Sequence, residues 1–335
     1  MDKLKAWWAA RGPSKRRLIQ LYAALLTNCN LKGFANGRIY KGPLKAVCVP
    51  GLNCYSCPGA VGSCPLGALQ NALADLRKPM IWYVLGLLLL FGAAFGRVIC
   101  GFLCPFGLIQ ELLHKLPVPK IGKSRMTRLL SRLKYAVLAV LVLLLPVLSG
   151  LWGPAYPAFC KYLCPAGTME GAILLLGNQN NSIGSEMLGP LFENKYILMI
   201  LIATACLFLY RAFCRFLCPL GALWGFFSRV ALFGVSVDEE ACTRCGRCIA
   251  VCKTDIRRVG DHECVQCGEC VRACPEQAIR WKKPGPILLS RKQAAGEAAR
   301  TEAERKHPPR GARIAGALAA LVILAAVIGL INTGA

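Results

Sequence analysis

Long apolar runs divide the chain and predict its architecture. Four of them are within or near the roughly 17–25 residues that a membrane-spanning helix needs; they are residues 81–99, 135–151, 196–210 and 314–331. Aromatic residues stand near the ends of these runs, as in the interfacial belts of membrane proteins; they are Trp82, Tyr83, Trp152, Tyr156, Tyr196 and Tyr210. The alternative, buried core helices of a large soluble protein, would not supply a run such as residues 138–145 without polar interruption.

A fifth apolar stretch, residues 18–27, is too short to span a membrane alone. It follows Arg16 and Arg17 and precedes Cys29, so it resembles a signal peptide with a lipoprotein site. Asn28 stands where such a site needs a small residue, which favours a retained first helix, short or partly re-entrant. With the four runs, this stretch predicts an all-α membrane bundle of about five transmembrane helices.

Composition and charge agree with a membrane protein. The chain is 55% hydrophobic, and its mean hydropathy is +0.46, well above that of a soluble domain. A net charge of +24 would suit a nucleic-acid-binding protein, but no nucleic-acid-binding motif accompanies it. Basic loops facing anionic lipid account for the charge better, so lipid is the expected partner and nucleic acid is not.

The distribution of basic residues predicts the orientation. Residues 115–134 hold seven Lys and Arg and no acid, whereas residues 149–195 hold only Lys161 and Lys195. The positive-inside rule therefore places the first segment in the cytoplasm, the second outside, and the chain after Arg211 inside again. Residues 30–79 are then expected outside although they carry six Lys and Arg, which conflicts with the rule.

Between Cys242 and Cys274 the spacing C-x2-C-x2-C-x3-C occurs twice. In two-cluster bacterial ferredoxins, three close cysteines of each run hold one [4Fe–4S] cluster and the fourth reaches the other cluster. This spacing assigns one cluster to Cys242, Cys245, Cys248 and Cys274, and the other to Cys264, Cys267, Cys270 and Cys252. Structural zinc uses pairs of ligands, and disulfides need an oxidising compartment, so two clusters in a small α+β ferredoxin-like domain are favoured.

A second cysteine motif, Cys-Pro-x-Gly, occurs four times, each at the start of a short apolar helix. Its cysteines are Cys64, Cys104, Cys164 and Cys218. Three copies extend to C-x3-C-P through Cys100, Cys160 and Cys214, whereas the first copy offers Cys54 and Cys57. Proline suits the first helical turn, and a thiolate just ahead of it faces the positive helix end, which favours metal ligation.

Successive copies follow successive spans and should alternate between the two membrane faces. The predicted inner site consists of Cys100, Cys104, Cys214 and Cys218, and the predicted outer site of Cys54, Cys57, Cys64, Cys160 and Cys164. Four cysteines can hold one iron–sulfur cluster, so one or two further clusters would form stepping stones across a layer of about 30 Å. Metal-free thiol pairs, and disulfides among Cys29, Cys48, Cys54, Cys57 and Cys64, are the alternatives.

Other cofactors are poorly supported. None of the three histidines lies in an apolar run, which excludes membrane haem with paired histidine ligands, and the chain has no C-x-x-C-H haem-attachment site. No G-x-G-x-x-G follows a strand-like segment, so a nucleotide domain is not supported. His114 could assist quinone chemistry, but a helix-end histidine at a basic surface needs no special role. Cys206, inside an apolar run, is interpreted as a packing residue.

At these motifs the sequence resembles the NapH and NosR family of polytopic ferredoxin proteins, over roughly residues 80–280. The resemblance is carried by Cys100-Gly-Phe-Leu-Cys104-Pro105, by Cys214-Arg-Phe-Leu-Cys218-Pro219 and by the two quartets. It implies quinol oxidation, or electron supply to enzymes across the membrane. The segment from Asn53 to Pro65, the motif at Cys160–Cys164 and the final helix go beyond the family's two-motif pattern.

The chain is accordingly divided into five parts. These are an N-terminal helix with an outer Cys-rich segment (1–79), a transmembrane domain (80–235), the ferredoxin domain (236–282), a charged tether (283–312) and a C-terminal transmembrane helix (313–335). The predicted protein is a multi-pass protein of the cell (inner) membrane with a cytoplasmic ferredoxin domain and no small-molecule substrate of its own. It would relay electrons from a ferredoxin or flavoprotein to an extracytoplasmic redox protein or quinone. A quinol dehydrogenase subunit and a redox sensor or assembly factor are the alternative functions.

Overall fold

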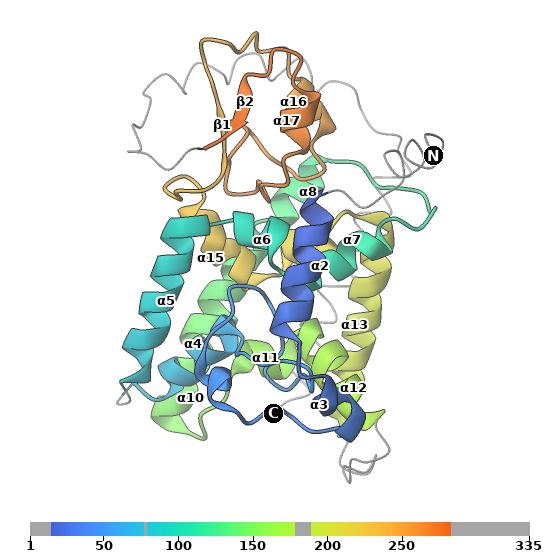
Figure 1. The fold of residues 1–335 in the computed structure, drawn as a ribbon. Coiled ribbons are helices and arrows are strands. Elements are labelled where there is room, and N and C mark those ends of the chain that lie inside the picture. The colour runs from blue at the N-terminus through green and yellow to red at the C-terminus, as the bar shows by residue number, and fades with distance from the viewer. Residues whose placement is uncertain (1–14, 77–78, 178–188, 283–335) are drawn as a thin grey trace.

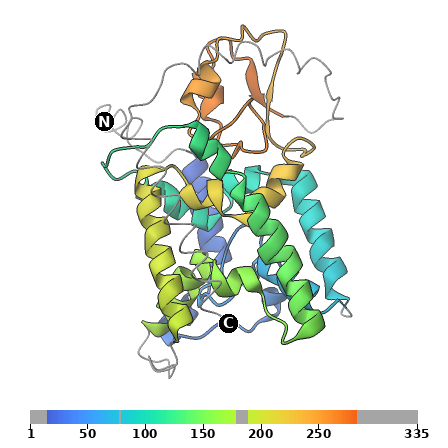
Figure 2. The same cartoon turned by 180° about the vertical axis from the view of Figure 1, so that it is seen from behind.

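The computed structural model describes residues 15–76, 79–177 and 189–282. Three long helical columns stand side by side, with a small lobe over one end of them (Figures 1 and 2). The columns are α5 (Met80–Phe95), α13 (Pro190–Phe208) and a continuous helix from residue 125 to residue 152. The continuous helix consists of α8 (Arg125–Leu130), α9 (Leu133–Val137), the π-helical η2 (Leu138–Leu144) and α10 (Leu145–Trp152).

The prediction of about five transmembrane helices is wrong for the described residues. Two helices there, Arg125–Trp152 and Pro190–Phe208, are long and apolar enough to cross a membrane. Helix α5 has 16 residues and therefore reaches about 24 Å, less than the hydrocarbon layer. It ends at Phe95, and the next residue, Gly96, has a φ of 46°, which glycine adopts more readily than other residues. The predicted run 81–99 is therefore not one continuous helix. The predicted run 314–331 lies outside the described residues.

The first apolar stretch forms α2 (Lys15–Thr27), a helix of 13 residues that supports other helices instead of spanning. It packs against α6 (Val98–Phe102) and α7 (Pro105–Leu113). Arg16 and Gln20 are buried in this contact. They donate to the carbonyl oxygens of Gly101, at 2.9 Å, and Cys104, at 2.8 Å. Helix α2 is thereby fixed against the backbone of the C-x3-C-P motif at Cys100–Cys104.

Short helices in pairs carry the Cys-Pro motifs. Two pairs, α6 with α7 and α14 (Ala212–Phe216) with α15 (Pro219–Phe227), lie at the end of the columns next to the lobe (Figure 1). The others lie towards the opposite end; they are α11 (Ala158–Tyr162), with η3 (Gly167–Ile173) and α12 (Leu174–Leu176), and α4 (Pro65–Ala74). The loop before α4 contains α3 (Leu31–Asn36) and η1 (Pro43–Ala46).

The lobe contains both C-x2-C-x2-C-x3-C runs. Its strands β1 (Val235–Val237) and β2 (Ile279–Trp281) pair antiparallel and bracket α16 (Arg247–Val251) and α17 (Glu269–Ala273). The two halves repeat one backbone pattern, since Arg244 and Gln266 have φ of 55° and 54° and Gly246 and Gly268 have φ of 72° and 77°. Equal left-handed turns between corresponding cysteines give the two quartets the same local shape.

Buried polar contacts dock the lobe onto the short helices. Arg215 of α14 forms a buried ion pair with Asp255, which also accepts a hydrogen bond from Thr127 at 2.9 Å. At Gly101 an added Cβ would lie 2.5 Å from the carbonyl oxygen of Val265. The backbone beside Cys100 and the backbone beside Cys264 are therefore in direct contact, which only glycine permits at this position.

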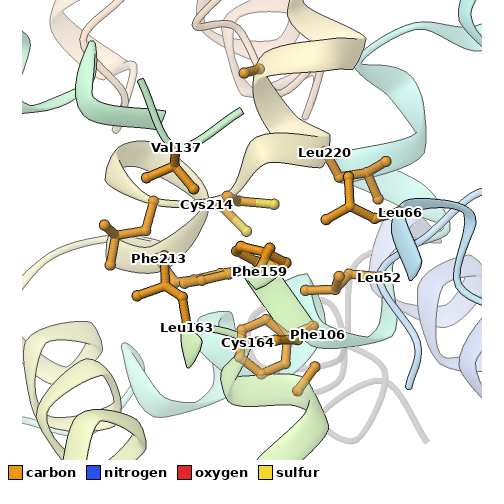
Figure 3. Packing of buried hydrophobic residues seen from close by; sticks show 14 of the residues in the cluster. Leu52, Leu66, Phe106, Val137, Phe159, Leu163, Cys164, Phe213, Cys214 and Leu220 are labelled. Carbon is orange, nitrogen blue, oxygen red and sulfur yellow. The ribbon is translucent and has the colours of Figure 1, made fainter. Parts of the chain in front are cut away.

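A continuous apolar core fills the helical part between its two ends. Figure 3 shows Phe106, Phe159 and Phe213 in this core, near Cys214 and Cys164. The rings of Phe106 and Phe213 meet edge to face with centroids 5.2 Å apart. Cysteines from both ends, such as Cys214 and Cys164, thus belong to one closely packed apolar interior.

Candidate functional site

The three C-x3-C-P motifs fold in the same way. In each, a five-residue helix contains the first cysteine and ends two residues after it. Proline disfavours helical backbone at the residue before it, and Cys104 and Cys218 accordingly have ψ of 116° and 109°. Pro105 and Pro219 then occupy the first turn of the next helix. The second cysteine is therefore the N-cap residue of a helix.

The glycine of each motif brings a hydrogen-bond donor to this capping cysteine. The N–H groups of Gly167 and Gly221 donate to Cys164 Sγ and Cys218 Sγ, both at 3.4 Å. An added Cβ at Gly221 would lie 3.4 Å from the carbonyl oxygen of Cys214, so glycine also allows close approach of the first cysteine. Free N–H groups and the positive helix end favour negative charge at the sulfur.

The inner site forms where two motifs meet beside the lobe. All four predicted cysteines are at most 9% exposed and line one small apolar cavity; they are Cys100, Cys104, Cys214 and Cys218. Leu52, Leu220 and Trp224 close the same cavity. Four buried thiols from two repeats provide the donor number of one [4Fe–4S] cluster.

The four inner thiols differ in acidity. A hydrogen bond from Cys218 outweighs burial and lowers the pKa of Cys214 to about 6. Burial, together with the nearby Cys214 and Cys100, raises the pKa of Cys104 to about 12. Cys214 is therefore the more acidic thiol of the Cys214–Cys218 pair. Iron would displace the protons of the other thiols, because metals bind the deprotonated form.

One buried donor in this cavity lacks a protein partner. Trp224 is 0% exposed, lines the cavity with the four cysteines, and has no acceptor for its Nε1–H among the described residues. An unpaired buried N–H costs about 1–3 kcal/mol. The sulfur atoms of a cluster would accept this hydrogen bond, so the residues present fit an iron–sulfur cluster at the inner site.

Glu111 holds the basic groups around the inner site. It is 3% exposed and accepts hydrogen bonds from Arg16 at 2.6 Å, Arg211 at 3.0 Å and Tyr210 at 2.5 Å. Burial raises the pKa of Glu111, but Arg211 and Arg16 outweigh it and bring the pKa to about 2. Arg211 also donates to the carbonyl oxygen of Cys100 at 2.6 Å, so this ion-pair cluster fixes a cysteine backbone.

Arginine stands three residues before the first cysteine in both inner motifs, as Arg97 and Arg211. Both are at most 1% exposed. Arg97 Nε donates to the carbonyl oxygen of His262 at 2.9 Å, which ties the inner motif to the lobe. The outer motif has Pro157 at the equivalent position, so a buried arginine at this position occurs only in the two inner motifs of the three.

The outer cysteines gather at the other end of the helical part. Burial, with the charges of Cys160, Cys54 and Cys64, raises the pKa of Cys164 well above its ordinary value. Burial and Cys64 likewise raise the pKa of Cys160 to about 12. An added Cβ at Gly67 would lie 3.8 Å from Cys160 Sγ. The first Cys-Pro copy and the C-x3-C-P motif at Cys160–Cys164 therefore meet around one site.

Cys57, the fifth predicted outer cysteine, has different surroundings. It is buried, and its thiol donates to Asn28 Oδ1 at 3.6 Å. The neighbour of Cys160 and Cys164 is Cys54, whose backbone N–H donates to Glu170 Oε2 at 2.7 Å. The structure thus brings together four of the five predicted outer cysteines and leaves Cys57 beside them.

Sequence reasoning missed two glutamines that contact the sites. Gln110 Nε2 donates to Cys214 Sγ at 3.0 Å, and its Oε1 accepts from the Cys214 N–H at 3.4 Å. Gln70 Nε2 donates to Cys160 Sγ at 3.4 Å, and its Oε1 accepts from the Phe159 N–H at 2.8 Å. Each glutamine is the sixth residue after a Cys-Pro cysteine, a regularity that the sequence contains.

In the lobe, the cysteines of the second predicted ferredoxin quartet share one environment. Burial, followed by the charges of Cys264, Cys267 and Cys252, raises the pKa of Cys270 to about 12. Cys252 comes from the first C-x2-C-x2-C-x3-C run, and the fold places it near cysteines of the second run.

The first predicted quartet lies nearer the surface of the lobe. Burial raises the pKa of Cys248, and Cys242 and Cys245 contribute to the rise. Cys274 is half-buried, and Cys248 and Cys274 pack on the same small core. The assignment of ligands to the two ferredoxin clusters stays a prediction.

No disulfide joins any of the twenty cysteines, so the structure does not contain the alternative disulfides among Cys29, Cys48, Cys54, Cys57 and Cys64. Within the described residues, no three Cys, His, Asp or Glu side chains converge closely enough for a single metal ion. A [4Fe–4S] cube differs from such a site, because each of its four thiolates binds a separate iron atom.

Cys206 and His114 lie beside the inner site without joining it. The buried Cys206 thiol donates to Gln110 Oε1 at 3.5 Å, in keeping with a packing residue. His114 Nδ1 is 3.2 Å from the Cys206 carbonyl oxygen, and its ring meets Tyr210 edge to face at 5.5 Å. Burial lowers the pKa of His114. These contacts fix the histidine ring at the end of α7, in keeping with a structural residue.

Two family models, both described as 4Fe–4S binding domains, match the chain. One matches three times, at residues 79–124, 135–180 and 196–236. The other matches twice, at residues 235–258 and 261–280. The first model covers the three C-x3-C-P motifs, and the second covers the two ferredoxin runs. The prediction of several [4Fe–4S] clusters is therefore confirmed.

Several curated relatives carry ferredoxin-type names. The methylamine utilization ferredoxin-type protein MauN of Methylorubrum extorquens is 28% identical over 256 residues, 73% of this chain and 74% of the relative. MauN of Paracoccus denitrificans is 29% identical, over 58% of this chain and 62% of the relative. The ferredoxin-type protein NapH of Haemophilus influenzae is 27% identical, over 54% of this chain and 57% of the relative. No solved structure matches the chain.

Proposed function

We propose that this chain, which belongs to the NapH-like family of ferredoxin-type 4Fe–4S proteins, relays electrons through a chain of four clusters. Two clusters would lie in the ferredoxin lobe, one at the inner site and one at the outer site. The observation that carries the proposal is the cavity lined by Cys100, Cys104, Cys214 and Cys218, with the unpaired Trp224 donor in it.

The contact between lobe and inner motif supports the first transfer step. The Cys100–Cys104 motif and the loop of Cys264 touch through Gly101 and Val265, with no side chain between them. Arg97 and Arg215 bind the lobe from both inner motifs. Two redox centres held this rigidly would keep a fixed separation, and the rate of electron transfer depends on that distance. The buried core around Phe159 would keep water out of the second step, to the outer site.

The protein's own residues then have defined tasks. When bound, a [4Fe–4S] cluster accepts and releases one electron at a time. Buried cysteines hold it, helix N-termini and glycine N–H groups stabilise the negative sulfurs, and the ion-pair cluster of Glu111 fixes the ligand backbone. The chain has to move no proton at the inner site for this role.

Exposed apolar side chains support a location in the cell membrane. Helix α2 exposes Leu25 and Leu26, α5 exposes Leu89 and Leu90, and α13 exposes Ile197. Apolar surface spread over several helices is typical of contact with lipid. The basic segment 115–134 adjoins the lobe, so the lobe would face the cytoplasm and receive electrons from a ferredoxin or flavoprotein. An extracytoplasmic redox protein would meet the outer site.

Vesicles containing the purified protein test this relay. A reductant on the lobe side should reduce a dye trapped inside, and Cys218→Ala should stop the transfer while the ferredoxin clusters remain. Cys164→Ala should block only the last step and leave the inner cluster reducible. Cys206→Ala is the matched control, because it removes a buried thiol beside the inner site that lines no cavity with the four cysteines. If Cys218→Ala and Cys164→Ala both transfer at the control rate, the relay is wrong and a sensor or assembly role is favoured.

A cavity at the lobe favours quinol oxidation as a second candidate function. Its volume is about 400 Å³, and it is lined by apolar side chains of α2, α5 and α6 together with Arg16 and Cys267. An apolar cavity with a few polar groups suits a small ring-shaped ligand, and Cys267 is a predicted cluster ligand. Quinol-dependent reduction of the clusters, abolished by Val98→Trp, which would fill the cavity, would favour this function. Reduction only by a protein donor would reject it.

A further inference from the structure

The sixth residue after each Cys-Pro cysteine occupies a special position. These residues are Gln70, Gln110, Glu170 and Trp224. Six residues along a helix advance about 9 Å from the capping cysteine, which is far enough to reach the motif on the other side of a site. All four side chains are at most 8% exposed, although three of them are polar or charged.

In three copies this residue contacts the first cysteine of the partner motif or its backbone. Gln70 donates to Cys160 Sγ at 3.4 Å. Gln110 donates to Cys214 Sγ at 3.0 Å. Glu170 Oε2 accepts from the Cys54 N–H at 2.7 Å. The pairing is reciprocal at the outer site, where Gln70 reaches from the first motif to the third and Glu170 reaches back.

The fourth copy completes the pattern at the inner site. There Gln110 reaches the Cys214 motif, and Trp224 is the residue that would reach back towards Cys100. Trp224 and Cys100 line the same cavity. The Trp224 Nε1–H finds no acceptor among the described residues, whereas the equivalent Gln70 and Gln110 each find a sulfur. An acceptor in the cavity itself would satisfy it.

We propose that Trp224 is a positioning and tuning residue of the inner cluster, whose sulfur accepts a hydrogen bond from the Trp224 indole N–H. The inference rests on the proposed cluster at Cys100, Cys104, Cys214 and Cys218. A hydrogen bond to sulfur stabilises the more negative, reduced cluster and so raises its reduction potential. Trp224 would join two side chains that already hydrogen-bond inner cysteines, Gln110 at Cys214 and Arg97 at Cys100. The outer site differs. There Gln70 donates to Cys160 Sγ, whereas the Glu170 carboxylate accepts a hydrogen bond from the Cys54 N–H.

Redox titration of the full chain, followed by EPR, tests this inference. Trp224→Phe keeps an aromatic ring but removes the N–H, so the midpoint potential of the inner cluster should fall while those of the ferredoxin clusters stay unchanged. Trp224→Gln places in this helix the donor that two other copies use, and it should move the potential back towards the wild-type value. Phe226→Leu is the matched control, because Phe226 is 60% exposed on the same helix. It should leave every potential unchanged.

The outcomes separate this inference from the proposed function. A wild-type protein without an inner cluster would reject the proposed function itself. An inner cluster whose potential is the same in the wild type and in Trp224→Phe would overturn the role of Trp224 alone. If Trp224→Phe loses the cluster, wild-type protein with ¹⁵N-labelled indole decides the matter. A nitrogen coupling to the reduced inner cluster in pulsed EPR is then expected, and its absence would overturn the hydrogen bond.

Discussion

Replacing Glu111 by glutamine tests the ion-pair cluster beside the inner site. The amide keeps the shape of the carboxylate but removes its charge, so Arg16 and Arg211 would stay buried without a counter-ion. Their side chains are 7% and 0% exposed, and neither can reach water without moving its helix. Both also hold motif backbone, at the Gly101 and Cys100 carbonyl oxygens. The damage should therefore concentrate at the inner site.

The expected magnitude follows from the burial of this cluster. Removing one partner of a buried ion pair costs about 3–5 kcal/mol, because an uncompensated charge remains in the interior. Such a loss changes the equilibrium constant of unfolding by roughly 10²–10⁴-fold. Exposed pairs contribute only about 0–1 kcal/mol, so the predicted loss depends on the 3% exposure of Glu111. Glutamine can still accept one hydrogen bond, which places the expected value near the lower end.

Anaerobic denaturant unfolding in detergent measures the effect. The inner cluster signal of Glu111→Gln should disappear at lower denaturant than that of the wild type, while the ferredoxin signals change less. Glu193→Gln is the control, because it makes the same substitution at an exposed site on α13 and should shift stability by at most about 0.5 kcal/mol. Equal stability of Glu111→Gln and Glu193→Gln would refute the reasoning.

Three other perturbations have defined outcomes. The pKa of Glu111 is lowered from 4.5 to about 2. The ionised carboxylate therefore stabilises the fold fully above pH 4.5, and this contribution is lost as the pH falls towards 2. Unfolding at two acidic pH values should show the loss in the wild type and not in Glu111→Gln. Cys54→Ser should remove about four iron atoms per chain and Cys57→Ser none, and equal iron contents would reject the outer quartet. Gly101→Ala adds a Cβ 2.5 Å from lobe backbone and should slow transfer from the ferredoxin to the inner site, whereas Gly86→Ala, with nothing within 4 Å, should not.

Local chemistry made the cysteine motifs predictable. Proline disfavours helical backbone at the residue before it, so the capping position of Cys104 and Cys218 is predictable from the Cys-Pro dipeptide. The ferredoxin runs likewise place their ligands within a few residues of one another. The number of spans was not predictable in this way, because apolar content alone does not reveal that Gly96 ends α5 after 16 residues. The same limit applies to α2: its length predicted a short first helix, but not that Arg16 and Gln20 would be buried against α6 and α7.

Tertiary structure decided how these local units combine into sites. Arg16 and Glu111 are 95 positions apart, and Gln110 and Cys214 are 104 apart. No periodicity in the sequence links such residues, because their contact depends on how the helices pack. Likewise, Cys54 lies near Cys160 whereas Cys57 contacts Asn28, because of the way the loop before α4 packs in the fold. The sequence by itself predicted which cysteines would bind iron, since ligand spacing is a property of neighbouring residues. Only the packed fold decided which motifs share a site and which buried donors face it, since those depend on distance in space.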